Sequence, residues 1–219
     1  MEKLDYKKEY KDLYLPKTKP MVIEVPSMKF IIVEGSGNPN SENGEYQEAL
    51  GLLYGLSFTI KMSKMGTKKI DGYFEYVVPP LEGLWWQENC KSIDYEHKDN
   101  FKWISMIRQP EFVTEDVFQW ACNEVSTKKG IDTANARFVE FEEGLCVQVM
   151  HIGSYDDEPE TIEKLDKFIQ ENNLKNDIGR EVENGMIRRH HEIYLSDPRR
   201  TETKNLKTVI RIPVVKGEK

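Results

Sequence analysis

The sequence predicts an α+β fold. Two pseudo-symmetric strand–helix–strand–strand modules would form one antiparallel sheet, with helices on one face and a ligand cleft on the other. The length of 219 residues suits one large domain or two small ones. An aromatic content of 11% argues against disorder. The order of strand, glycine turn, helix and two strands occurs twice, with Gly35-Ser36 corresponding to Gly153-Ser154. A sheet face left free by the helices would provide the ligand groove.

The first module is expected at about residues 20–130, after a charged, tyrosine-rich lead at 1–19 that we interpret as a loose arm or short helix. The β-branched segment Met28–Glu34 predicts a strand that ends at a glycine turn. Apolar residues at three- and four-residue spacing from Tyr46 to Ile60 predict a helix. The remaining expected elements are a strand at Gly72–Pro80, a short piece at Leu84–Trp86, a strand at Phe101–Arg108, and a helix from Thr114, a good N-cap, to Lys129.

The second module is expected at about residues 131–215, so that the whole domain spans 20–215. It should open with a hairpin around Glu143-Gly144 and continue with a helix that begins at Pro159. A strand at His190–Leu195 and a last strand at Leu206–Pro213 should complete it. This alignment of the modules makes Glu75 the counterpart of Glu192.

The overall charge and the lack of targeting signals limit the classes of partner. There are 31 Lys and Arg against 38 Asp and Glu, a net charge of −7, and a net anion is a poor general binder of nucleic acid. The apolar runs, such as Phe30–Val33, are far shorter than the ~20 residues of a membrane helix, and the start has no signal-peptide core. Three scattered cysteines fit a reducing compartment. We therefore expect a cytoplasmic monomer or homodimer that contacts neither nucleic acid nor membrane.

Glu192 is the first candidate for chemistry. Side chains alternate along a strand, so Ile193 and Leu195 would face the helices, and His190, Glu192 and Tyr194 would face the open groove. A carboxylate in a partly apolar groove favours a cationic partner. The alternative is an exposed strand glutamate without a function.

Aromatic side chains on or beside the expected strands are the candidates for binding a flat or cationic ligand. For any single tryptophan the alternative is packing in the core, as expected for Trp120 on a helix stripe. Adjacent residues of a strand point to opposite faces, so at most one of the neighbouring pair belongs to the core. The set is Tyr73, Tyr76, Trp85, Trp86, Trp103 and Tyr194.

Other kinds of site have weaker signals. His190-His191-Glu192 has metal-ligating residue types, but neighbours on a strand diverge and no helical H-E-x-x-H is present, so we expect no metal. Gly35-Ser36-Gly37 lacks the lysine of a phosphate loop. Cys122 and Cys146 lie on elements expected to be buried, Cys90 has no nearby partner in the sequence, and no G-x-S-x-G is present. We expect no cofactor.

Three segments resemble those of the GyrI-like small-molecule-binding proteins: Leu81–Trp86, Phe101–Met106 and His190–Arg200. The resemblance runs from about Pro20 to Val215. It implies two strand–helix–strand–strand modules around a pseudo-twofold axis, with a ligand cleft between them. Some members are the effector-binding halves of transcription activators that sense cationic drugs, and Glu192 matches their pocket glutamate. Others protect DNA gyrase from toxins.

The sequence is most similar to a stand-alone subgroup that resembles hydrolases opening the cyclopropane ring of DNA-alkylating compounds. On this first hypothesis, Glu192 would orient or deprotonate the attacking water, and Tyr76 or Tyr194 would hydrogen-bond the ligand's carbonyl group. The ligand would contact Trp85, Trp86, Trp103, Tyr73, Glu75 and His190. The second hypothesis is a non-catalytic sequestering or gyrase-protecting protein. A third is tetrapyrrole binding through His190 or His191, because a related fold is used for haem.

Overall fold

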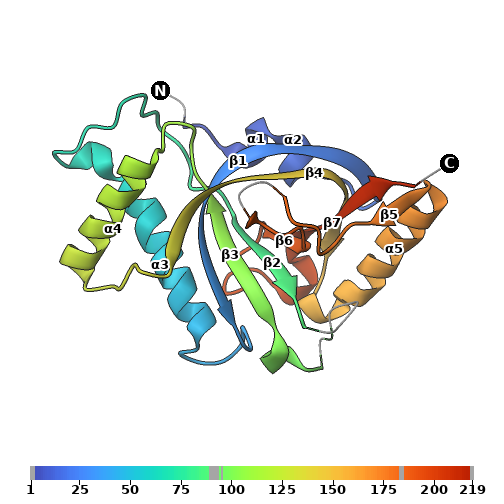
Figure 1. Ribbon diagram of the computed structural model, residues 1–219. Coiled ribbons are helices and arrows are strands. Elements are labelled where there is room, and N and C mark those ends of the chain that lie inside the picture. Colours follow the sequence, from blue (N-terminus) through green and yellow to red (C-terminus); the bar gives the residue numbers. More distant parts are fainter. Residues whose placement is uncertain (1–2, 89–93, 95, 183–184, 218–219) are drawn as a thin grey trace.

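A closed, barrel-like antiparallel sheet dominates the computed structural model, which describes residues 3–88, 94, 96–182 and 185–217 (Figure 1). Six strands follow the order β4-β1-β3-β2-β6-β7, and a β4–β7 pairing closes the ring. The short β5 pairs with the far end of β7. This confirms the α+β class with an antiparallel sheet. The strands are β1 Met21–Ser36, β2 Leu81–Trp86, β3 Lys102–Arg108, β4 Ala136–Ile152, β5 Leu174–Asn176, β6 His190–Tyr194 and β7 Lys207–Lys216.

The three long helices α3, α4 and α5 lie on the outside of this sheet (Figure 1). The helix α3 packs against α4 and on β1 and β3, whereas α5 covers β4 and β7 on the other side. The order strand–helix–strand–strand occurs twice, as β1-α3-β2-β3 and as β4-α5-β6-β7 with the short β5 after α5. The helices are α1 Tyr6–Glu9, α2 Lys11–Tyr14, α3 Glu45–Lys61, α4 Glu115–Lys129 and α5 Glu158–Glu171.

The helix-covered face of the sheet is the face that carries Glu192, contrary to the sequence prediction. Glu192 lies opposite Ile210 of β7, which packs under α5. Ile193 belongs instead to the apolar cluster of the inner face, and Leu195 packs against the same cluster. The prediction assumed an open sheet whose apolar face only helices could cover. In the closed sheet the strands and the N-terminal segment bury the inner face, so the long helices α3, α4 and α5 cover the outer face.

The N-terminal segment is packed against the inner face of the sheet rather than loose. It holds the two short helices α1 and α2, and the rings of Tyr6 and Tyr14 are buried in the inner cluster. The guanidinium carbon of Arg108 lies 4.6 Å from the centre of the Tyr6 ring. Arg211 donates a hydrogen bond to the backbone oxygen of Leu13 over 2.9 Å. Burial of two aromatic rings and this hydrogen bond therefore fix the segment in place.

Two expected strand boundaries are wrong. Only Tyr76 of the segment Gly72–Pro80 forms a bridge, with Leu4, and the strand begins after the prolines, which have no N–H to donate to a sheet. The expected hairpin is the single strand β4, because pairing with β1 continues on both sides of Gly144. Gly144 has a φ of 69°, which a glycine adopts without strain, so the turn signal marks a local distortion within one strand.

Candidate functional site

A cleft of about 810 Å³ lies on the outer face over β2 and β6, between α3 and the first residue of α5. This volume is within the usual range for small-molecule pockets, about 300–1,000 Å³. The cleft therefore lies on the same face as the helices, not on the opposite face as the sequence predicted. Its walls and floor include Tyr46, Leu50, Tyr54 and Phe58 of α3, Leu81 and Trp85 of β2, Glu192 and Tyr194 of β6, Tyr155, Glu158, and the loop Ser196–Arg199.

The carboxylate of Glu192 is held at both oxygens. Nε2 of His190 lies 3.0 Å from Oε1, and the Tyr194 hydroxyl donates to Oε2 over 2.8 Å. The indole Nε1 of Trp85 in turn donates to the Tyr194 oxygen over 2.8 Å. The structure thus brings together four of the predicted site residues, and alternation along β6 puts His190, Glu192 and Tyr194 on one face as expected.

Glycine at position 83 makes this arrangement possible. Gly83 of β2 lies directly opposite Glu192 in the sheet. A Cβ atom at this position would lie 2.6 Å from Nε1 of Trp85 and 3.2 Å from the Tyr194 hydroxyl oxygen. The absence of a side chain therefore leaves the space in which the indole reaches the tyrosine.

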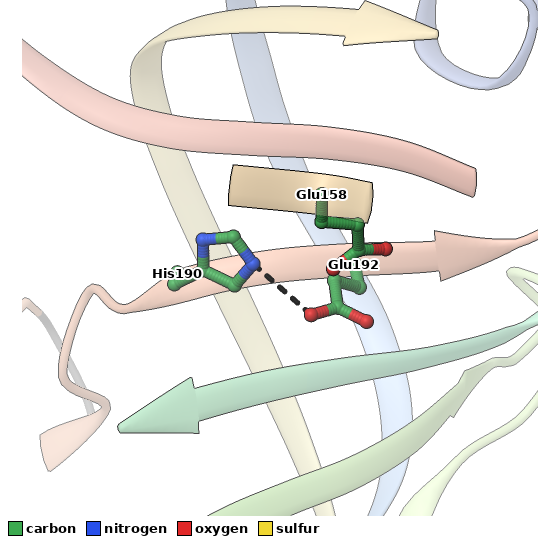
Figure 2. Close-up of side chains that lie close together, drawn as sticks. All are labelled: Glu158, His190 and Glu192. Atoms are coloured by element: carbon green, nitrogen blue, oxygen red, sulfur yellow. Dashed lines mark hydrogen bonds and ion pairs between the residues drawn. The ribbon is translucent and has the colours of Figure 1, made fainter. Parts of the chain in front are cut away.

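Glu158 is a second buried carboxylate at the floor of the cleft, and sequence reasoning missed it. It is the first residue of α5, and Figure 2 shows its side chain beside those of His190 and Glu192 from β6. One ligand-type atom from each of the three lies within 4.8 Å of the others. Acidic residues are common in the first turn of any helix, so its place beside Pro159 gave no sign of a site.

Three tyrosine hydroxyls share this acidic environment. Burial, and then the negative charge of Glu192, raises the pKa of Tyr194 well above its usual value. Burial, followed by Glu192 and Glu158, raises the pKa of Tyr155 to about 12. The pKa of Tyr46 is raised by burial and then by Glu192. These hydroxyls stay protonated at neutral pH and are available as hydrogen-bond donors. Sequence reasoning had assigned Tyr46 to the core stripe of its helix and given Tyr155 no role.

The other predicted tryptophans lie outside the cleft lining. Trp103 is fully buried beneath α3, with its ring edge-on to Tyr46 at 5.1 Å between ring centres. Trp86 lies on the opposite face of β2 from Trp85, and the guanidinium of Arg189 lies 4.6 Å from its ring centre. Of the two neighbours, only Trp85 lines the cleft.

The site residues predicted on the segment before β2, Tyr73, Glu75 and Tyr76, are also outside the cleft lining. Tyr76 is buried in the inner cluster. The Tyr73 hydroxyl donates to the backbone oxygen of Lys61 over 2.8 Å. Glu75 forms an ion pair with Lys64. The expected position of Glu75 near Glu192 is therefore wrong.

His191 points to the inner face and belongs to a buried charge network. Its Nδ1 lies 2.9 Å from Oε2 of Glu143, and its Nε2 lies 3.0 Å from Oε2 of Glu82. Burial alone would lower the pKa of His191, but Glu143 and Glu82 outweigh it and raise the pKa to about 9. Since both ring nitrogens are occupied, His191 has no free atom for an iron ligand. Of the cysteines, Cys122 and Cys146 are buried and Cys90 lies outside the described residues.

The chain belongs to the family of GyrI-like small-molecule-binding domains, whose model matches residues 18–215. It is similar to an uncharacterized conserved protein from Listeria innocua, with 47% identity, a TM-score of 0.88, and coverage of 97% of this chain and 100% of that one. It is also similar to a hydrolase encoded by lin2189 from the same organism, with 46% identity, a TM-score of 0.87, and coverage of 98% and 100%.

More distant similarity is limited to the fold. The EcmrR C-terminal domain is 12% identical, with a TM-score of 0.51 and coverage of 90% of this chain and 98% of that one. A search of curated proteins gave no match. Within the described residues, no helix combines the length and the apolar character needed to cross a membrane.

Proposed function

We propose that this protein is a hydrolase that takes an aromatic small molecule into the cleft between α3 and α5. The observation that carries the proposal is the Glu192 carboxylate, fixed by His190 and Tyr194 at the floor of an aromatic cleft. A chain similar to this one over nearly its full length is described as a hydrolase. Tyr46, Tyr54 and Trp85 supply flat surfaces for the ligand, with Leu50 and Phe58 as further apolar contacts.

Glu192 acts on water. Glu192 lines the cleft, so a water molecule between the ligand and the carboxylate would lose a proton to Glu192 as the water oxygen attacks the ligand. The Tyr194 hydroxyl turns from Glu192 to an oxygen atom of the ligand, while the Trp85 N–H continues to donate to the tyrosine oxygen. The tyrosine then stabilises the negative charge that develops on the ligand.

The substrate class within this proposal is an aromatic compound with a cyclopropane ring conjugated to a carbonyl group. Water adds to one ring carbon, and the C–C bond to that carbon breaks. Its electron pair passes into the conjugated system, where the carbonyl oxygen takes up a proton and becomes a phenol. The support is the resemblance of the segment Leu81–Trp86 to that of a subgroup similar to ring-opening hydrolases, together with a cleft whose aromatic walls suit a flat ligand.

The experiment compares Glu192→Gln with wild type on a synthetic spirocyclopropyl dienone, with ring-opened product measured by liquid chromatography and mass spectrometry. Product formation should fall by at least ~10²-fold, since general-base catalysis typically contributes ~10²–10⁴-fold. Binding of the aromatic ligand should persist, because stacking does not need the charge.

The matched control is Glu75→Gln, which removes a carboxylate outside the cleft lining and should leave turnover unchanged. Wild-type turnover in the Glu192→Gln variant would contradict the proposed role of Glu192. Product that stops at one equivalent per chain in wild type would contradict the hydrolase and favour a sequestering protein.

A further inference from the structure

We infer that Glu158, His190 and Glu192 form a binding site for one divalent transition-metal ion, of the Zn²⁺ or Co²⁺ type, at the floor of the cleft. The three residues come from two distant parts of the chain, the start of α5 and the strand β6 (Figure 2). This inference does not rest on the proposed hydrolase activity, because metal binding can be measured without a substrate.

The distances between the three side chains suit a small ion. The three candidate ligand atoms lie within 4.8 Å of one another, and His190 Nε2 is 3.0 Å from Glu192 Oε1. Around a tetrahedral zinc ion, bonds of ~2.0–2.2 Å to nitrogen and oxygen place neighbouring ligand atoms roughly 3.3–3.5 Å apart. Changes of roughly 1.5 Å or less, within the reach of a glutamate side chain, would bring the three atoms to these separations.

The charge at the floor of the cleft also favours a cation. Glu158 and Glu192 are both buried, and their carboxylates lie close together beside the imidazole of His190. The pKa of Tyr155 is raised by burial and then by Glu192 and Glu158, so the charged side chains that act on its hydroxyl are negative. A bound dication would compensate both carboxylates.

The types and accessibility of the ligand atoms select the kind of ion. One imidazole nitrogen with carboxylate oxygens suits zinc and its transition-metal neighbours, whereas calcium and magnesium take oxygen ligands. Both glutamates line the cleft, so at least one coordination position would face the cleft and accept water or a ligand atom. In the proposed hydrolysis the Glu192 carboxylate accepts a proton from water. An ion bound to that carboxylate would compete with the proton, so metal-loaded and metal-free protein would differ in turnover.

The sequence argument against a metal used the wrong set of neighbours. His191 does diverge from His190 and Glu192, because it points to the inner face. The third ligand comes from Glu158, which lies far away in the sequence and which only the tertiary fold brings close.

The test uses the full chain after treatment with a chelator. Zn²⁺ is titrated by calorimetry and Co²⁺ by visible absorption. We expect one ion to bind per chain. The affinity for the ion should fall by at least ~10-fold in His190→Gln and in Glu158→Gln, since mutating even an outer-shell partner of a metal site typically lowers metal affinity by ~10–100-fold. His97→Gln is the control: it removes an exposed histidine beside Asp94, a surface pair with metal-ligating groups, and should leave the affinity unchanged.

An NMR measurement on the wild-type protein tests the inference even if a variant does not fold. Co²⁺ should shift or broaden the ring-proton resonances of His190 in the NMR spectrum at one equivalent, and leave those of His97 unchanged. Absence of binding to the wild type, wild-type affinity in both ligand variants, or loss of binding in His97→Gln alone would overturn the inference.

Discussion

Replacing Glu143 with glutamine should strongly destabilise the fold, because Glu143 is the carboxylate that contacts both His191 and Arg211 in a buried charge network. Its side chain is 2% exposed. Its Oε2 accepts from Arg211 Nη1 over 3.1 Å and lies 2.9 Å from His191 Nδ1. The variant Glu143→Gln keeps the shape and leaves the charge of Arg211 without this partner. Removing one partner of a buried pair typically costs about 3–5 kcal/mol of unfolding free energy.

The pKa of Glu143 gives a second measure of the same interaction. Burial alone would raise this pKa, but the charges and hydrogen bonds of His191 and Arg211 outweigh burial and lower it to about 2. The difference from the ordinary value of 4.5 corresponds to about 3 kcal/mol. The two magnitudes agree, so we expect a loss of about 3–5 kcal/mol at pH 7.

The pH dependence has a definite sign. Between pH 4.5 and about 2, the unfolded chain binds a proton at Glu143 that the folded chain does not. The stabilisation is therefore complete above pH 4.5 and is lost as the pH falls towards 2. The difference between wild type and Glu143→Gln should shrink over this range.

The assay is urea unfolding followed by circular dichroism, at pH 7 and again below pH 4. Glu142→Gln is the matched control, since Glu142 is the exposed neighbour on the same strand and its change should stay within about 0.5 kcal/mol. A loss below about 1 kcal/mol for Glu143→Gln at pH 7, or a loss that does not vary with pH, would refute the reasoning.

Two further predictions concern the tryptophans on and beneath the cleft. Trp85→Phe should reduce the quenching of tryptophan fluorescence by a bound aromatic ligand, because Trp85 lines the cleft. Trp86 is outside the lining, so Trp86→Phe should leave the ligand-dependent quenching intact. Equal effects in titrations of the two variants would be inconsistent with ligand binding in this cleft. Gly35→Ala should lower the unfolding free energy by about 1–3 kcal/mol in thermal or urea unfolding, because the new Cβ would lie 2.3 Å from Cη2 of the fully buried Trp103; wild-type stability would show that the indole can move away at no cost.

The helices and several strands could be predicted because their signals are local. Thr114 caps α4 by accepting from the backbone N–H of Val117, and Gly130 ends the helix with a φ of 65°. Alternation along β6 correctly put His190, Glu192 and Tyr194 on one face. These features depend on residues within a few positions of one another, so the sequence alone was sufficient for them.

The closure of the sheet could not be predicted, and it explains the main errors. The β4–β7 pairing joins strands that are distant in the sequence, and it creates an inner face that is buried without any of the long helices. The same closure makes the helix-covered face the face of the cleft. Glu158 also needed tertiary information, because nothing in its own segment links it to β6.

Neighbouring residues of β6 lie on opposite faces of the sheet: His191 belongs to the buried network of the inner face, and Glu192 lines the cleft on the outer face. His191 is fixed on the inner face by Glu82 and Glu143, and Arg211 extends the network to the backbone of Leu13 in the N-terminal segment. Because these contacts hold the middle of a five-residue strand, they also fix the backbone that carries Glu192 on the outer face. The inner network therefore supports the floor of the cleft, although none of its side chains belongs to the cleft lining.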